Sequence, residues 1–199
     1  MVYYGDDLGD RPKKNRDRRQ AAIRRQERRQ ARREWAASLR GDEAREAAKE
    51  AALRLLDRQD RSVGECRAKL DERGFHEEAI DAALDRLVEL DLLNDERYAR
   101  MLVRTRHAER GLVGRALVEQ LHRKQIPPHI IEVAMEEVDE ESIRSVAMDF
   151  AQRRIRSMAS VERDRKFRRL VSMLARKGYS PGLAISVVTE LLEEGDGVE

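Results

Sequence analysis

The residues of this sequence that are best placed to do chemistry are basic, and the chemistry they offer is the binding of anions. Residues 97–124 hold eight Lys or Arg against two Asp or Glu, and residues 153–178 hold ten against two. Such blocks can neutralise phosphates or pair with an acidic protein groove, so they favour an anionic partner. The alternative is an ordinary charged surface that pairs with local acids. The expected contact surface consists of Arg104, Arg106, Arg110, Arg115, Arg123, Lys124, Arg153 and Arg154.

The other reactive side chains lack the spacing that catalysis or metal binding needs. The histidines show neither HxxxH spacing nor a CxxC partner: His76, His107, His122 and His129. Nucleotide-binding patterns such as GxxxxGK(S/T) are absent, and Gly111 and Gly114 follow no predicted strand. A solvated corner between helices explains the acidic residues of 136–141. We therefore expect no enzymatic activity, no cofactor and no metal.

The elements that must position the arginines are predicted to be helices, because strong helix formers dominate and β-branched or aromatic runs are scarce. Ser62–Glu65 forms a capping box that starts one helix. Gly74 is suited to end that helix in the left-handed conformation. Phe75 and Ile80 then have the spacing of a hydrophobic staple around a cap at His76. A third helix of the same unit follows.

This order of helix, turn and staple recurs at offsets of 51 and 53 residues. The corresponding stretches are Leu70-x3-Gly74-Phe75-x4-Ile80, Leu121-x3-Gln125-Ile126-x4-Ile131 and Leu174-x3-Gly178-Tyr179-x4-Ala184. Long helical proteins show accidental similarity at some offset, but here the turn and the staple agree as well. We therefore predict an all-α protein of three tandem three-helix, helix-turn-helix-like repeats.

The predicted repeats occupy residues 46–93, 94–138 and 139–194. Residues 1–45 are predicted to be a basic tail, disordered or marginally helical, because they carry few sizeable apolar residues. Residues 195–199 are an acidic end. Trp35, in the arginine-rich tail, is an aromatic residue that the repeat pattern does not assign to a core. The scarcity of such residues argues against sequence-specific single-strand binding by stacking.

The only cysteine, Cys66, excludes an internal disulfide framework and fits a reducing compartment. It aligns with Leu117 and Leu170 of the other repeats, so we expect a small core residue. No apolar stretch approaches the roughly 20 residues that span a bilayer, and the N-terminus has no apolar signal segment. We expect a cytoplasmic protein.

The stretch from Leu92 to Pro127 resembles the central signature of the RecX family, bacterial regulatory proteins that act on the recombinase RecA. The matching elements are Leu93-Asn94-Asp95-Glu96-Arg97-Tyr98-Ala99, Arg104-Thr105-Arg106, Arg110-Gly111 and Leu121-x2-Lys124-x-Ile126. The resemblance extends over residues 48–193 and leaves out the basic tail. Two positions depart from it. Leu112–Gly114 stands where the family has an aromatic residue and glycine, and Gln125 replaces a glycine, so the second helix pair is expected to turn slightly differently.

The resemblance implies an elongated, curved molecule that binds in the groove of the RecA filament on single-stranded DNA. It implies inhibition of the ATPase, strand-exchange and co-protease activities of RecA in DNA repair, although the sequence leaves open inhibition or stimulation. We expect a monomer that also binds DNA weakly through its basic tail and basic helices. The alternative is a helical, DNA-binding architectural protein that acts without a recombinase. High DNA affinity with a steep dependence on salt would favour that alternative.

Overall fold

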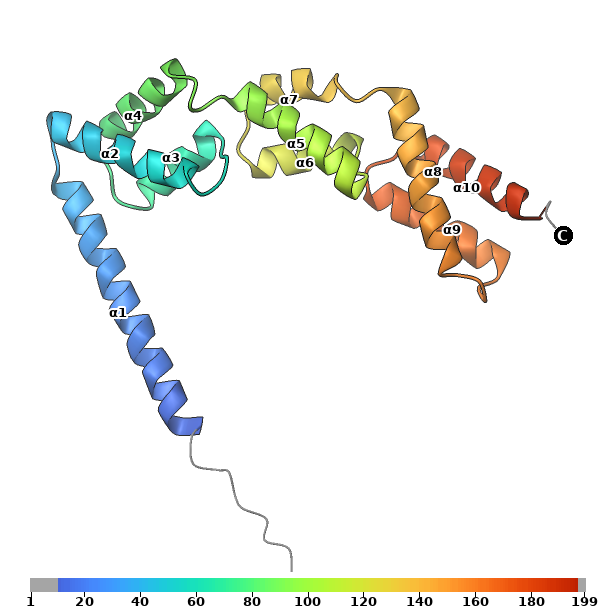
Figure 1. Cartoon of the computed structure of the whole chain (residues 1–199), viewed down its shortest axis with the longest axis horizontal. Coiled ribbons are helices and arrows are strands. Elements are labelled where there is room, and N and C mark those ends of the chain that lie inside the picture. The colour runs from blue at the N-terminus through green and yellow to red at the C-terminus, as the bar shows by residue number, and fades with distance from the viewer. Residues whose placement is uncertain (1–10, 197–199) are drawn as a thin grey trace, which may run out of the picture. The chain divides into compact units, whose positions relative to one another are not determined.

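A computed structural model describes residues 11–196 of the chain, and all regular structure in that range is helical (Figure 1). The predicted all-α class is confirmed. The predicted tail before residue 11 and the predicted acidic end from residue 197 lie outside the described residues. The helices are α1 (Arg11–Ser38), α2 (Gly41–Leu56), α3 (Val63–Asp71), α4 (Glu77–Glu89), α5 (Asp95–Arg110), α6 (Gly114–Arg123), α7 (Pro128–Met135), α8 (Glu140–Arg156), α9 (Arg163–Arg176) and α10 (Pro181–Asp196).

The chain forms two compact units. The first unit comprises the residues up to 59 together with 66–90, and the second comprises 60–65 together with the residues from 91 onward. After α1 the helices follow in sets of three, α2–α4, α5–α7 and α8–α10. In the last two sets every helix packs on the other two, and in the first set α2 packs on α4. Helix α2 begins at Gly41, inside the stretch predicted as tail, and α1 covers much of the rest of that stretch.

The first unit is built on the packing of α2 against α4. The face that α2 buries is mostly alanine, including Ala48 and Ala52 at 0% exposure, and small side chains let the two helices approach closely. Leu84 and Leu87 of α4 fill the space opposite. Cys66 of α3 is fully buried, as its alignment with core leucines predicted. The role of this residue is therefore packing.

The second unit contains two apolar cores. The first joins α5, α6 and α7, and the second joins α8, α9 and α10 with Val113. Asn94 caps α5 by accepting from the backbone N–H of Arg97 at 2.8 Å, and Asp139 caps α8 by accepting from Ser142 at 2.6 Å. Both caps satisfy amides that a helix start leaves without partners.

The same left-handed turn follows the second helix of every set. Its φ angle is 90° at Gly74, 55° at Gln125 and 96° at Gly178. In each turn the next residue donates its N–H to the carbonyl five positions earlier, Phe75 to Leu70, Ile126 to Leu121 and Tyr179 to Leu174, over 3.2–3.3 Å. Gln125 keeps the turn but stays near the narrow left-handed minimum of residues with a Cβ. The second turn therefore differs slightly from the others, as expected.

Each turn is also a packing joint. A Cβ on Gly178 would lie 2.0 Å from the carbonyl oxygen of Val113, and the N–H of Val113 donates to the carbonyl of Lys177 at 2.9 Å. Elsewhere in the second unit, Ser62 Oγ donates to the carbonyl of Lys124. Ser62 and Val113 occupy corresponding repeat positions, so the same joint is made twice with different donors. Gly178 is required here by both its φ angle and the close approach.

Candidate binding surface

The basic surface begins on α5, where spacings of three and four residues place arginines on one face. Arg100 and Arg104 both reach Glu137, which follows α7, with Nε to carboxylate distances of 3.1 and 2.9 Å. The side chain of Arg104 is 74% exposed. An exposed pair of this kind exchanges readily for another anion, because it contributes little stability.

Lys124 is engaged inside the protein. Its ammonium lies 2.9 Å from Glu65 Oε1, and both side chains are largely buried. Burial lowers the pKa of Lys124, but its interactions with Glu65 and Tyr98 outweigh burial and raise the pKa overall. Arg106 is half-buried and lines the same narrow space between α5 and α6. Of these two predicted contact residues, Lys124 has its charge neutralised by the Glu65 carboxylate inside the protein.

Arg115 and Arg123 lie on α6 and differ in their surroundings. Arg115 is 88% exposed and pairs with Glu119 one turn later, at 3.0 Å. Arg123 is exposed at the end of the helix and forms no ion pair with a residue that the structure describes. Both guanidinium groups face solvent and can meet a partner.

A third basic group gathers where the end of α5 meets α8 and α9. Lys177 donates its ammonium to the carbonyl of Arg110, which ends α5. The same ammonium lies 4.5 Å from the centre of the Phe150 ring, and the Arg154 guanidinium lies 5.5 Å from it. Burial, and then the charges of Arg154 and Arg153, lower the pKa of Lys177. We call Arg110, Arg153, Arg154 and Lys177 the basic joint.

The pKa of Lys177 is lowered whereas that of Lys124 is raised, and the difference has a simple cause. The two lysines occupy the same repeat position, 53 residues apart. Glu65 neutralises Lys124, whereas the position corresponding to Glu65 in the next repeat is Ala116. Lys177 was absent from the residues predicted to bind a partner, although the repeat offset from Lys124 would have identified it. The structure brings it together with three predicted residues, Arg110, Arg153 and Arg154.

Within the described part of the chain, no group of His, Cys, Asp and Glu could hold a metal ion. His107, the one buried histidine of that part, lies 3.2 Å from the carbonyl of Leu112 and 2.9 Å from Ser142 Oγ, so it bridges α5 to α8. No helix in residues 11–196 is long and apolar enough to cross a membrane. The arrangement therefore provides Lys and Arg side chains, held on helices, that can bind an anionic partner.

Comparison with known proteins identifies the family. The family models described as RecX, first three-helix domain, and RecX, second three-helix domain, match residues 48–87 and 94–135. The regulatory protein RecX of Streptomyces coelicolor is 40% identical over 149 residues, which cover 75% of this chain and 79% of that protein. The chain belongs to the RecX family.

Other RecX proteins agree with this assignment. The regulatory protein RecX of Amycolatopsis mediterranei is 37% identical over 158 residues, which cover 79% of this chain and 90% of that protein. The crystal structure of RecX from Lactobacillus salivarius superimposes with a TM-score of 0.68 at 25% identity, covering 74% of this chain and 96% of that one. The predicted resemblance to RecX is confirmed.

The two matched RecX domains divide the candidate residues. The predicted contact residues on α5 and α6, from Arg104 to Lys124, lie inside the second RecX domain. Arg153, Arg154 and Lys177 lie beyond both matched domains, in the helices α8 and α9 and the turn after α9. Helix α1 precedes both.

Proposed function

We propose that this protein is a regulator that binds the RecA recombinase filament on single-stranded DNA and inhibits its ATPase, strand-exchange and co-protease activities. The observation that carries the proposal is membership of the RecX family, whose relatives are named regulatory proteins. The proposal includes a cytoplasmic location and action as a monomer. The proposal fits a chain whose candidate binding surface consists of exposed arginine side chains.

The proposed contact surface is narrower than the sequence suggested. The exposed guanidinium groups of Arg104, Arg110, Arg115 and Arg123, with Arg153 and Arg154 of the basic joint, supply paired hydrogen bonds to carboxylates or phosphates. Arg106 and Lys124 support this surface from the space between α5 and α6. A surface of this kind steers encounter with an anionic partner as well as holding it.

The deciding experiment is the ATPase rate of RecA on single-stranded DNA, measured while the full-length protein is titrated in. We expect the rate to fall as the protein approaches stoichiometry with RecA. An unchanged rate at near-stoichiometric protein overturns the proposal. If the protein then binds DNA tightly by itself, with a steep salt slope, the architectural alternative takes its place.

The contact surface is tested by neutralising two arginines of the basic joint. The variant Arg153→Gln/Arg154→Gln should need several times more protein for half-inhibition, because it loses charge where no local acid compensates. The matched control is Arg54→Gln/Arg86→Gln, which removes the same charge from exposed arginines already paired with Glu50 and Glu89. Equal inhibition by both variants would assign the contact to other residues.

A further inference from the structure

Helix α1 presents a large basic surface that the RecX domains do not include. Residues 17–35 are all exposed, and residues 17–34 hold eight arginines, no lysine and three acids. Among the residues whose side chains the structure describes, no hydrogen bond or ion pair is formed by the arginines from Arg18 to Arg32. Arg29 interacts electrostatically with Glu72, and the other exposed guanidinium groups of this stretch are available to an external anion.

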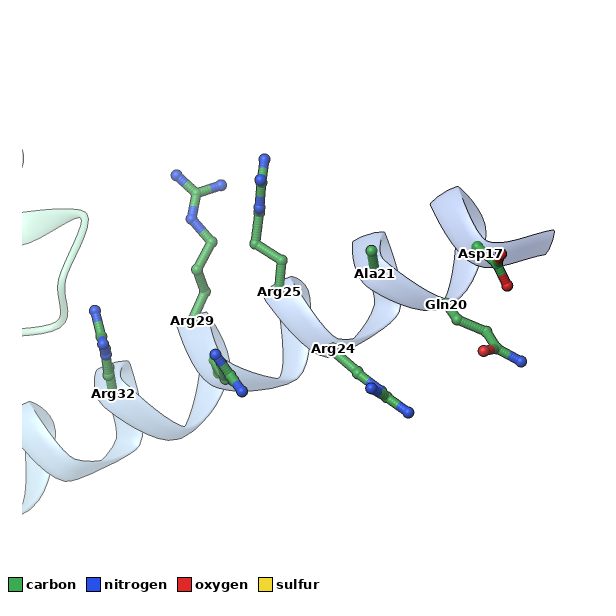
Figure 2. A pocket seen from close by; sticks show the side chains of 8 residues that line it. Asp17, Gln20, Ala21, Arg24, Arg25, Arg29 and Arg32 are labelled. Atoms are coloured by element: carbon green, nitrogen blue, oxygen red, sulfur yellow. The ribbon is translucent and has the colours of Figure 1, made fainter. Parts of the chain in front are cut away.

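The arginines are grouped on one side of α1. At 3.6 residues per turn, positions 18, 25, 28, 29 and 32 fall within about 100° of one another around the helix axis. Glu27 and Glu34 fall on the opposite side. Figure 2 shows Arg25, Arg29 and Arg32 extending to one side of the helix and Arg24 to the other. We call positions 18, 25, 28, 29 and 32 the arginine face.

The C-terminal end of α1 is anchored to the first unit, whereas residues 17–35 before it are exposed. Ala36 and the following Leu39 are buried, at 2% and 6% exposure. The carbonyl of Arg33 would lie 2.7 Å from a Cβ on Gly74, so α1 packs closely on the turn after α3. The carbonyl of Ala37 lies 2.7 Å from His76 Nε2. The helix is therefore part of the first unit at its C-terminal end, and the five positions of the arginine face are exposed.

Trp35 completes this surface. It is 55% exposed and lies three residues after Arg32 and seven after Arg28, hence beside the arginine face. An exposed indole next to guanidinium groups provides a stacking platform for an unpaired base, while the guanidinium groups bind the phosphates. A membrane surface would instead need an apolar face, and Ile23 is the only aliphatic residue larger than alanine between residues 17 and 35.

We propose that α1 is a binding site for single-stranded DNA without sequence preference, in which the arginine face contacts phosphates and Trp35 stacks on a base. This inference goes beyond regulation of the recombinase, because the site lies outside the matched RecX domains and needs no recombinase to act. The site would bind the strand through its charge and base stacking alone. Arginines four residues apart are separated by about 6 Å along the helix axis.

The test uses the full-length protein and a fluorescein-labelled oligothymidylate of thirty nucleotides, with no recombinase present. Trp35 is the only tryptophan of the chain, so its emission reports on the site directly. We expect oligothymidylate to quench this emission in parallel with the rise in fluorescence anisotropy. Trp35→Ala should weaken binding by about five- to a hundredfold, the usual effect of losing one stacked base.

Two charge-matched variants locate the site. Arg25→Gln/Arg28→Gln/Arg32→Gln keeps good helix formers and should reduce the salt slope of binding by about 2, since each contact to a single strand contributes about 0.7. The control Arg54→Gln/Arg58→Gln/Arg86→Gln removes the same charge from exposed positions on other parts of the first unit and should leave binding unchanged. Circular dichroism verifies that both variants stay helical.

Three outcomes overturn the proposal. The first is binding of oligothymidylate without quenching of Trp35 emission. The second is equal weakening of binding by the two triple variants, and the third is competition by polyglutamate of equal charge as strong as that by the oligonucleotide. The last outcome would assign α1 to an acidic protein. Failure of any of these tests leaves the RecA ATPase experiment unaffected, so the two proposals stand or fall separately.

Discussion

At the residue scale, one residue in the turn after the second helix of each three-helix set adopts the left-handed conformation, which is unfavourable for residues other than glycine. Glycine occupies two of these positions, but Gln125 holds φ 55° with a side chain. A residue with a Cβ pays roughly 1 kcal/mol for the left-handed region. The hydrogen bond from Ile126 to Leu121 and the burial of Ile126 offset that cost.

Gln125→Gly should therefore stabilise the protein by up to about 1 kcal/mol, because relief of the left-handed strain exceeds the added freedom of the unfolded chain. Urea denaturation gives the free energy of unfolding. The matched control is Gln120→Gly inside α6, which should destabilise by about 1 kcal/mol. Loss of stability in both variants would contradict the account.

Tyr179 provides a pH-dependent prediction. Its ring is 4% exposed, its hydroxyl has no hydrogen-bond partner among the described residues, and burial raises the pKa of Tyr179 from 10.0 to about 12. Below pH 10 the phenol is protonated in both folded and unfolded chains. Between pH 10 and about 12 only the unfolded chain loses the proton, so stability falls with rising pH, by about 2–3 kcal/mol in total.

Tyr179→Phe should remove this part of the alkaline loss. At pH 7 it should be neutral or stabilising by up to about 1 kcal/mol, because it removes a buried hydroxyl without a partner. Urea denaturation of both proteins at pH 9 and at pH 11.5 measures the difference. An identical loss of stability in the two proteins would show that other groups govern the alkaline limit.

At the element scale, the second helices of successive sets start differently, although they occupy the same place in the repeat. Ser62 and Glu65 close a capping box at the start of α3, with Glu65 N–H donating to Ser62 Oγ at 2.9 Å. Glu65 also binds Lys124. Helix α6 has Val113 and Ala116 at these positions and no acid in its first turn. The start of α6 therefore lacks both the cap and the counter-charge.

Ala116→Glu should supply that missing carboxylate. We expect a gain in stability of about 0.5–1 kcal/mol from the helix dipole and from Lys177, decreasing as salt is added. Thermal unfolding at low and high salt measures it, and Ala116→Gln serves as the uncharged control. The gain should shrink in the background of Lys177→Met. A gain that persists there would rule out the lysine as the partner.

At the scale of the whole molecule, stability comes from helices that pack on one another within each unit. The end of α1 takes part in this packing through Ala36 and Leu39. The arginine face does not, because residues 17–35 are exposed. Net charge is only +2, but the basic residues lie in blocks separated by acidic ones. Binding and stability therefore depend on different parts of α1.

Deletion of residues 1–32 should leave the free energy of unfolding within about 0.5 kcal/mol, because residues 17–32 are all exposed. Deletion of residues 1–40 should cost about 2–3 kcal/mol, because it also removes the buried Ala36 and Leu39. Urea denaturation of the two truncated proteins beside the full chain checks both values. Equal stability of the two truncated proteins would contradict the anchoring role of the last turn of α1.

Much of the local structure could be predicted from the sequence, because its signals act over a few residues. The capping box at Ser62 and the recurring turn are both present as predicted. The burial of Cys66 followed from its alignment with core leucines. The helix at residues 11–38 was harder to predict, because so few apolar residues contribute to it.

The sequence by itself determined the helical class, the repeating order of helices and turns, and the identity of the basic residues. Only the tertiary structure decided which of those cations is neutralised. Lys124 and Lys177 stand at the same repeat position, yet one meets Glu65 and the other meets Arg153 and Arg154. Glu65 lies 59 residues before Lys124 in the chain. Because Coulomb interactions depend on distance in space, the charge available to a partner emerges only after folding.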